Sequence, residues 1–254
     1  MFETDIDKKA NNGFSRAEVH DLKKLDRVVT QMLLDGPALL NRALLLQRMR
    51  EFGLANKPWG GLAKFQDWFN VSKVGTLQIP TELVDFLLYA AARKPDTVLE
   101  VGVFTGGTAV FSCAFFQALN PNVIYHCLDI KDSLLLLPET RARLNLKTHF
   151  GKTSDDFTGQ PFDIVFIDGD HSFAWAKRDY LNLGRHARKV CAFHDIHAKE
   201  YLPKGGGIYT FWRQLRAALP LEVAMLEFAH SPLGVGVQKD GCWMGIGVLD
   251  YTHA

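Results

Sequence analysis

Two carboxylates and a histidine stand together where an apolar segment ends, in the stretch FIDGDHS at residues 166–172. Segment 162–167 has the composition of a buried strand, and Asp168, Asp170 and His171 follow it directly. A buried charge costs several kcal/mol unless it is paired or coordinated. We therefore predict that this cluster belongs to a functional site, with Asp170 serving as a cap for the helix that follows.

A second polar pair, His194 and Asp195, ends the apolar segment 190–193. Neighbouring parallel strands lie about 4.8 Å apart, so the tips of two such strands can bring Asp168 and Asp195 to a common ion. Hard oxygen ligands suit Mg²⁺, which leaves positions for the adjacent hydroxyls of a substrate. A cation lowers the pKa of a bound hydroxyl, and a nearby imidazole such as His171 can remove the proton.

Helices and strands alternate from about residue 80 onward, which predicts a parallel sheet covered by helices on both faces. The last two strand-like segments have no helix between them and predict a terminal antiparallel hairpin. We expect a doubly wound, Rossmann-like α/β fold with a mostly parallel, seven-stranded sheet. Six of its strands are expected near 97–102, 122–130, 162–168, 189–195, 221–228 and 243–251, with one more just before Phe150.

The first 75 residues have a different character, with helical periodicity over 15–52 and an aromatic-rich segment at 56–70. We predict two parts, a helical N-terminal extension at 1–75 and a ligand-binding domain at 76–254. The extension is expected to form a lid, a dimer contact or both, so we expect a homo-oligomer.

Composition excludes several classes of protein. The formal net charge of +1 gives no reason to expect nucleic acid as a partner. No apolar stretch approaches the roughly 20 residues of a membrane span, and the N-terminus lacks a signal-peptide pattern. Four cysteines without CxxC spacing indicate neither a disulfide framework nor a zinc site. We expect a cytoplasmic protein with a small-molecule substrate and no membrane partner.

Glycines and an acidic residue mark the ends of the first two predicted strands. The turn LEVGVFTGGT places glycines at 102, 106 and 107, which allow close approach of a ligand to the backbone and to the next helix. Asp129, which ends the second strand, is placed to accept hydrogen bonds from ribose hydroxyls. The G-x-x-x-G-G spacing differs from the dinucleotide pattern, and no Walker lysine follows. These features indicate an adenosine-containing cofactor.

The segment VLEVGVFTGGT at 98–108 resembles the first motif of class I S-adenosylmethionine-dependent methyltransferases. FIDGDHS, followed by FHDI at 193–196, resembles the small-molecule branch that includes sugar and macrolide O-methyltransferases, with a more distant likeness to catechol-type enzymes. The resemblance begins near Gln78 and does not cover residues 1–75. It implies methyl transfer to a hydroxyl of a small molecule, such as a sugar or a glycosylated product of natural product biosynthesis.

At matching positions the resemblance also implies the cofactor contacts. Glu100 and the backbone around the glycines would hold the methionine end, an acidic residue would hold the ribose, and a polar pair would flank the adenine. The implied cofactor-binding residues are Glu100, Gly102, Gly106, Asp129, Thr153 and Ser154.

In metal-dependent members of this branch, the positions of Asp168, His194 and Asp195 ligate a divalent cation such as Mg²⁺. His171 stands where sugar-modifying members carry a general base, so Asp168 and His171 are the implied catalytic residues. The position of His194 often carries an oxygen ligand in such relatives, which leaves both the presence and the identity of the metal open.

Three alternatives remain from sequence. One is an N-methyltransferase that acts on an amino sugar or amine without a metal. Another is a nicotinamide-dependent oxidoreductase, against which the glycine spacing counts. The third is a non-catalytic cofactor-binding partner of another enzyme.

Overall fold

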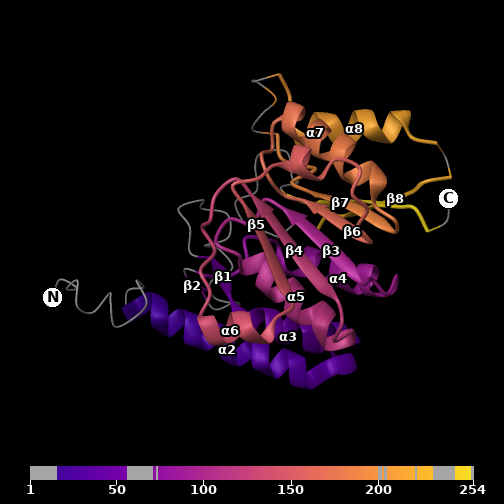
Figure 1. The fold of residues 1–254 in the computed structure, drawn as a ribbon. Coiled ribbons are helices and arrows are strands. Elements are labelled where there is room, and N and C mark those ends of the chain that lie inside the picture. The colour runs from indigo at the N-terminus through magenta and orange to yellow at the C-terminus, as the bar shows by residue number, and fades with distance from the viewer. Residues whose placement is uncertain are drawn as a thin grey trace.

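A seven-stranded sheet lies between two layers of helices (Figure 1). The computed structural model describes residues 16–55, 71, 72, 74–199, 202, 205–220, 222–230 and 244–252. In chain order, the strands of the sheet are β3 (Thr97–Val101), β4 (Ile124–Asp129), β5 (Leu146–Phe150), β6 (Ile164–Ile167), β7 (Val190–His194), β8 (Ala224–Phe228) and β9 (Ile246–Asp250). Their spatial order is β5-β4-β3-β6-β7-β9-β8.

The first five strands of the sheet are parallel, and β9 runs antiparallel to both of its neighbours. The predicted fold class is confirmed, including the terminal antiparallel hairpin formed by β8 and β9. The chain order reverses at β3, so the switch point of the sheet falls between β3 and β6. In open α/β sheets, ligands bind at the carboxyl ends of the strands beside such a point.

Helices cover both faces of the sheet. One layer contains α2 (Arg16–Asp35), η1 (Gly36–Leu40), α3 (Arg42–Phe52), α4 (Pro80–Ala91) and α5 (Gly107–Leu119). The other contains α7 (Phe173–Asn182) and α8 (Ile208–Ala218), seen above the orange strands in Figure 1. The remaining elements are β1 (Leu54–Ala55), β2 (Val71–Ser72), α6 (Pro138–Arg143), η3 (Ser154–Phe157) and η4 (Gly184–His186).

Alternate residues of the central strands enter two separate hydrophobic cores. On β3, Val98 packs into the core beneath α2–α5, whereas its neighbour Leu99 packs into the core beneath α7 and α8. Successive side chains of a strand point to opposite faces, and both faces here are covered. This arrangement explains why the central strands are nearly continuous apolar runs.

Helices α2 and α3 of the N-terminal region share the core of the sheet. Leu25 and Val29 of α2 are buried with Phe115 of α5, and Phe52 of α3 packs edge-on against Phe111 at a centroid distance of 5.2 Å. The aromatic segment 56–70 lies outside the described residues, and the lid or dimer role of residues 1–75 stays a prediction. Among the described residues, no helix is both long and apolar enough to cross a membrane.

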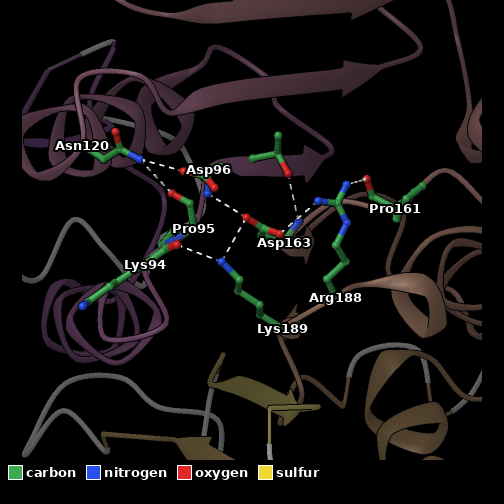
Figure 2. A network of polar contacts seen from close by, with 9 residues as sticks. Lys94, Pro95, Asp96, Asn120, Pro161, Asp163, Arg188 and Lys189 are labelled. Atoms are coloured by element: carbon green, nitrogen blue, oxygen red, sulfur yellow. Dashed lines mark hydrogen bonds and ion pairs between the residues drawn. The ribbon is translucent and has the colours of Figure 1, made fainter.

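A buried carboxylate joins the amino ends of three strands (Figure 2). Asp163, which precedes β6 and is 3% exposed, accepts the backbone N–H of Asp96 at 2.7 Å. It also pairs with Lys189 at 3.2 Å and with Arg188 at 3.4 Å. A buried charge is tolerated when it is paired and hydrogen-bonded in this way. The network lies at the opposite end of the sheet from Asp168 and Asp195, so we assign it a structural role.

Two histidines share a contact on the outer strands of the parallel half. His126 Nδ1 of β4 lies 2.9 Å from His149 Nε2 of β5, and the two rings are stacked. Phe162 packs edge-on against His126, and Phe157 packs edge-on against His149. Burial lowers the pKa of both histidines, that of His126 to about 4. The pair is therefore neutral at pH 7 and belongs to the core.

Acid should destabilise the protein through this pair. Below pH 6.5 the unfolded chain takes up a proton at His126 that the folded chain takes up only near pH 4, so this stability is present above pH 6.5 and is lost as the pH falls toward 4. We expect His126→Gln to flatten the fall in the free energy of unfolding between pH 6.5 and 4.5, measured by urea denaturation. His20→Gln, at an exposed position of α2, is the control and should leave the slope unchanged.

Candidate active site

The polar residues found at strand ends in the sequence meet at the carboxyl edge of the sheet. Asp168 follows β6, while His194 is the last residue of the adjacent strand β7 and Asp195 comes next. His171 lies between the end of β6 and the start of α7. Because parallel strands end at the same edge, residues separated by more than 20 positions in the chain form one cluster.

Short contacts join the four side chains. His194 Nδ1 lies 3.0 Å from Asp168 Oδ1 and 3.5 Å from Asp195 Oδ2. His171 Nδ1 lies 3.0 Å from Asp195 Oδ2, and its Nε2 lies 3.8 Å from Asp168 Oδ1. One ligand atom each from Asp168, His194 and Asp195 falls within 4.8 Å of the others, so these three residues could hold a metal ion.

The charges in this cluster stabilise one another. Burial alone raises the pKa of a carboxyl group, but His194 and His171 outweigh it and hold the pKa of Asp168 at about 2 and that of Asp195 below its usual range. Burial likewise lowers the pKa of an imidazole, yet the two carboxylates raise the pKa of His171 to about 9 and that of His194 well above normal. Two imidazolium groups, with a summed charge of +2, therefore balance two carboxylates. A divalent cation would supply the same charge.

The backbone at Asp195 is strained and braced. Its φ of 59° lies in the left-handed region, which a residue other than glycine occupies at a cost of order 1–3 kcal/mol. Just beyond it, His197 donates its backbone N–H to the carbonyl oxygen of Met244 at 2.8 Å. The neighbouring Gly245 N–H is in turn accepted by the buried carboxylate of Glu82, on α4, at 3.1 Å. These contacts keep the Asp195 side chain at the strand tip.

Glu100 of β3 brings an unsatisfied acceptor to the same place. Its Oε2 accepts the hydroxyl of Tyr125 at 2.5 Å, whereas the buried Oε1 has no hydrogen-bond partner among the residues that the structure describes. Burial raises the pKa of Glu100 well above its usual range. A buried polar atom without a partner costs about 1–3 kcal/mol, so this oxygen is suited to a donor from a bound molecule.

The glycine turn allows β3 to approach the tip of β6. Gly102 has a φ of 86°, and a Cβ atom there would lie 2.3 Å from the carbonyl oxygen of Asp168. Gly106, with a φ of 88°, is the residue before α5. Gly107 and Thr108, in the first turn of that helix, line a cavity at this edge of the sheet. Only glycine fits at Gly102 without displacing the loop that carries Asp168.

Asp129, at the end of β4, holds the glycine turn from the other side. Its Oδ2 accepts the backbone N–H groups of Val103 at 2.8 Å and Phe104 at 3.0 Å. Its Oδ1 accepts the backbone N–H of Lys131 at 3.0 Å. The sequence assigned Asp129 only to ribose binding, so this positioning of the turn was missed.

Two cavities meet at Gly102, Phe104, Asp168 and Gly169. The first, of about 270 Å³, is lined by Glu100, His171, His194 and Asp195 among others. The second, of about 500 Å³, is lined by Asp129, Thr153 and Ser154 among others. Together they are of the size of small-molecule sites. Except for Gly106, every residue predicted for the site lines one of these two cavities.

Other lining residues were not predicted to act in the site. Gln78 lines the first cavity, and Trp175 and Asp179 line the second. Trp175 and Asp179 are one helical turn apart on α7, the helix that follows FIDGDHS, so their spacing offered a signal. Gln78 lies 90 positions before Asp168 in the chain, and no local pattern connects the two.

Asp170 was predicted to cap a helix, and its carboxylate contacts the start of α7. Asp170 Oδ1 accepts the backbone N–H of Ser172 at 2.8 Å, and Ser172 is the residue before the helix begins at Phe173. The carboxylate thus forms a turn ahead of the helix rather than a bond to its first-turn N–H groups. Asp170 also lines the second cavity.

Residues 99–196 match the model of a family described as a methyltransferase domain. The match runs from β3 to the turn after β7, so the matched segment contains the strand ends that carry Glu100, Asp129, Asp168 and Asp195. Gln78 and Met244, which line the first cavity, come from outside the matched segment.

Solved structures share the fold. The O-methyltransferase TomG from Streptomyces achromogenes, involved in tomaymycin synthesis and solved in complex with SAM, is 15% identical, over 78% of this chain and 92% of TomG, with a TM-score of 0.50. A candidate O-methyltransferase from Klebsiella pneumoniae is 13% identical, over 96% of this chain and 93% of that protein, also with a TM-score of 0.50. No curated protein sequence is significantly similar to this chain.

Proposed function

We propose that the protein is an S-adenosylmethionine-dependent methyltransferase that acts on a hydroxyl of a small molecule, with help from a divalent cation and a histidine base. One observation carries this proposal. The unpartnered oxygen of Glu100 and the cluster of Asp168, His171, His194 and Asp195 line the same cavity.

The residues at the strand ends fit S-adenosylmethionine. Its ammonium group would supply the donor that Glu100 Oε1 lacks, and a cationic partner would favour the ionised carboxylate. Its adenosine would occupy the second cavity, with the ribose hydroxyls beside Asp129 and the adenine beside Thr153 and Ser154. The SAM complex of TomG, which has the same fold, supports this assignment.

A divalent cation fits the cluster of Asp168, His194 and Asp195. The 3.0 Å between His194 Nδ1 and Asp168 Oδ1 is close to the separation of adjacent ligands in an octahedral shell with bonds of about 2.1 Å. When bound, the cation would lower the pKa of an acceptor hydroxyl. The oxygen-rich ligand set favours Mg²⁺ or a similar hard ion.

His171 is the proposed proton acceptor because its ring lines the cavity next to both carboxylates. A cation paired with Asp168 and Asp195 would withdraw the negative charge that raises the pKa of His171, and burial would then favour its neutral, basic form. The deprotonated acceptor oxygen would then attack the methyl carbon of S-adenosylmethionine. A C–O bond would form as the C–S bond breaks, and the sulfur would keep the electron pair. The protein's contribution is mainly positioning and deprotonation.

The acceptor class we propose is a sugar or a glycosylated natural product. Two protein carboxylates and one imidazole leave positions on an octahedral ion for two adjacent hydroxyl oxygens, which sugars provide. An N-methyltransferase would not need the cation, so the chelator experiment described in the Discussion separates the two reactions.

Calorimetry with S-adenosylhomocysteine and NAD⁺ tests the cofactor assignment. We expect S-adenosylhomocysteine to bind far more tightly than NAD⁺, and Asp129→Ala to weaken its binding about 10- to 100-fold, because hydrogen bonds to a charged group contribute about 1.5–3 kcal/mol each. Asp132→Asn, at an exposed position three residues away, is the control. Tighter binding of NAD⁺ would contradict the proposal.

A further inference from the structure

We propose that Gln78 is a positioning residue that orients Asp168 toward the other cation ligands and presents an amide oxygen to O–H donors in the cavity. This inference rests on the proposed function and adds a residue from outside the segment 99–196 that matches the methyltransferase family model. Gln78 is 1% exposed, and it lines the cavity that also contains His171, His194 and Asp195.

The orientation of the Gln78 amide follows from its neighbour. Its Nε2 lies 2.6 Å from Asp168 Oδ2. A reversed amide would place a carbonyl oxygen against an ionised carboxylate, with no proton between the two acceptors. The N–H therefore faces Asp168, and Oε1 points elsewhere. That oxygen is buried and has no partner among the described residues.

The two oxygens of the Asp168 carboxylate have different partners. Oδ2 is occupied by the Gln78 amide, whereas Oδ1 faces His194 Nδ1 at 3.0 Å. With one oxygen fixed, rotation of the carboxylate away from His194 and Asp195 would break a short hydrogen bond to a charged group. Partners of metal ligands act in this way and are worth about 10- to 100-fold in metal affinity.

The backbone that carries Gln78 is itself firmly held. Thr76 donates its N–H to the carbonyl oxygen of Gly53 at 3.0 Å, and accepts the N–H of Ala55 at 2.8 Å. Gly75 is so close to the end of α3 that a Cβ atom there would lie 2.4 Å from the carbonyl oxygen of Gly53. The N-terminal region thus fixes the segment from which Gln78 reaches the site.

The Oε1 atom of Gln78 indicates which chemical group a bound molecule would place beside it in the cavity. A buried amide oxygen without a donor costs about 1–3 kcal/mol, and an O–H group would remove that cost. The donor is either a hydroxyl of the acceptor or a water on the cation, which have the same hydrogen-bonding chemistry. Kinetics distinguish the two, because only the first makes the KM of the acceptor depend on Gln78 at saturating metal.

Manganese calorimetry on protein saturated with S-adenosylhomocysteine tests the positioning of Asp168. We expect Gln78→Met, which lacks the amide, and Gln78→Glu, which lacks the N–H, each to bind Mn²⁺ about 10- to 100-fold more weakly than the wild type. Gln31→Met on the exposed side of α2 is the control. Mn²⁺ affinities within twofold of the wild type in both folded variants would overturn the proposal.

A second measurement separates this inference from the metal model. In metal-free protein, the Nδ1 proton of His194 bonded to Asp168 should give a strongly downfield NMR resonance. We expect this resonance to shift or broaden in both Gln78 variants and to persist in Gln31→Met. If the wild type binds no Mn²⁺, the metal part of the proposed function fails, and the resonance still decides whether Gln78 orients Asp168. An unchanged resonance would refute that role.

Discussion

Replacement of His171 by alanine is expected to lower kcat about 10²- to 10⁴-fold, the usual contribution of a positioned general base. His171 lines the cavity next to Asp168 and Asp195, and its side chain makes no predicted contact with the cofactor. The affinity for S-adenosylhomocysteine should therefore stay within about twofold of the wild type. Steady-state kinetics and calorimetry on the same preparation measure the two effects.

Chemical rescue makes the His171 prediction specific. The alanine variant leaves space for free imidazole, which should restore part of the lost rate if the missing function is proton transfer. His20→Ala, on the exposed face of α2, should behave like the wild type and show no response to imidazole. A His171→Ala enzyme with full activity at neutral pH would show that another group, or none, removes the proton.

Substitution of either carboxylate of the cluster, as in Asp168→Asn or Asp195→Asn, should abolish cation-dependent activity. Each change removes a charged ligand from the three residues that can hold the ion, so the loss of Mn²⁺ affinity should exceed the 100-fold upper range for residues that only support a ligand. It also leaves a buried imidazolium without one of its partners. Breaking such a pair costs about 3–5 kcal/mol, so the thermal midpoint should fall as well.

The wild-type enzyme provides a readout that does not depend on the folding of these variants. EDTA should remove its activity, and added Mg²⁺ should restore it. Glu139→Gln, an exposed carboxylate change on α6, should retain both the activity and the response to metal. Full activity in EDTA would reject the metal model and favour the N-methyltransferase alternative.

Much of the site could be predicted from local sequence patterns at the strand ends. Glu100, Asp129, Asp168 and Asp195 each end or directly follow a short apolar strand, and parallel strands deliver such residues to one edge of the sheet. The repeating pattern of strand and helix was sufficient to predict that edge. The same logic correctly predicted the fold class and the antiparallel hairpin at the C-terminus.

Roles that depend on contacts between distant segments were not accessible in this way. Asp129 looked like a ribose ligand, yet it also accepts two backbone N–H groups from the glycine turn. Asp170 looked like a helix cap, and it bonds the residue ahead of the helix instead. Both outcomes depend on the path of the backbone around each carboxylate, which residue types alone do not specify.

The sequence by itself determined the doubly wound sheet and the group of residues at its carboxyl edge, because hydrophobic periodicity and strand order are encoded locally. Only the tertiary structure decided which atoms in that group have partners. It placed Gln78 against Asp168 and set two imidazoles against two carboxylates. It also left one oxygen each of Glu100 and Gln78 without a partner within the described part of the chain. Hydrogen bonding and charge balance act over about 3 Å, so they are settled only when segments far apart in the chain are packed together.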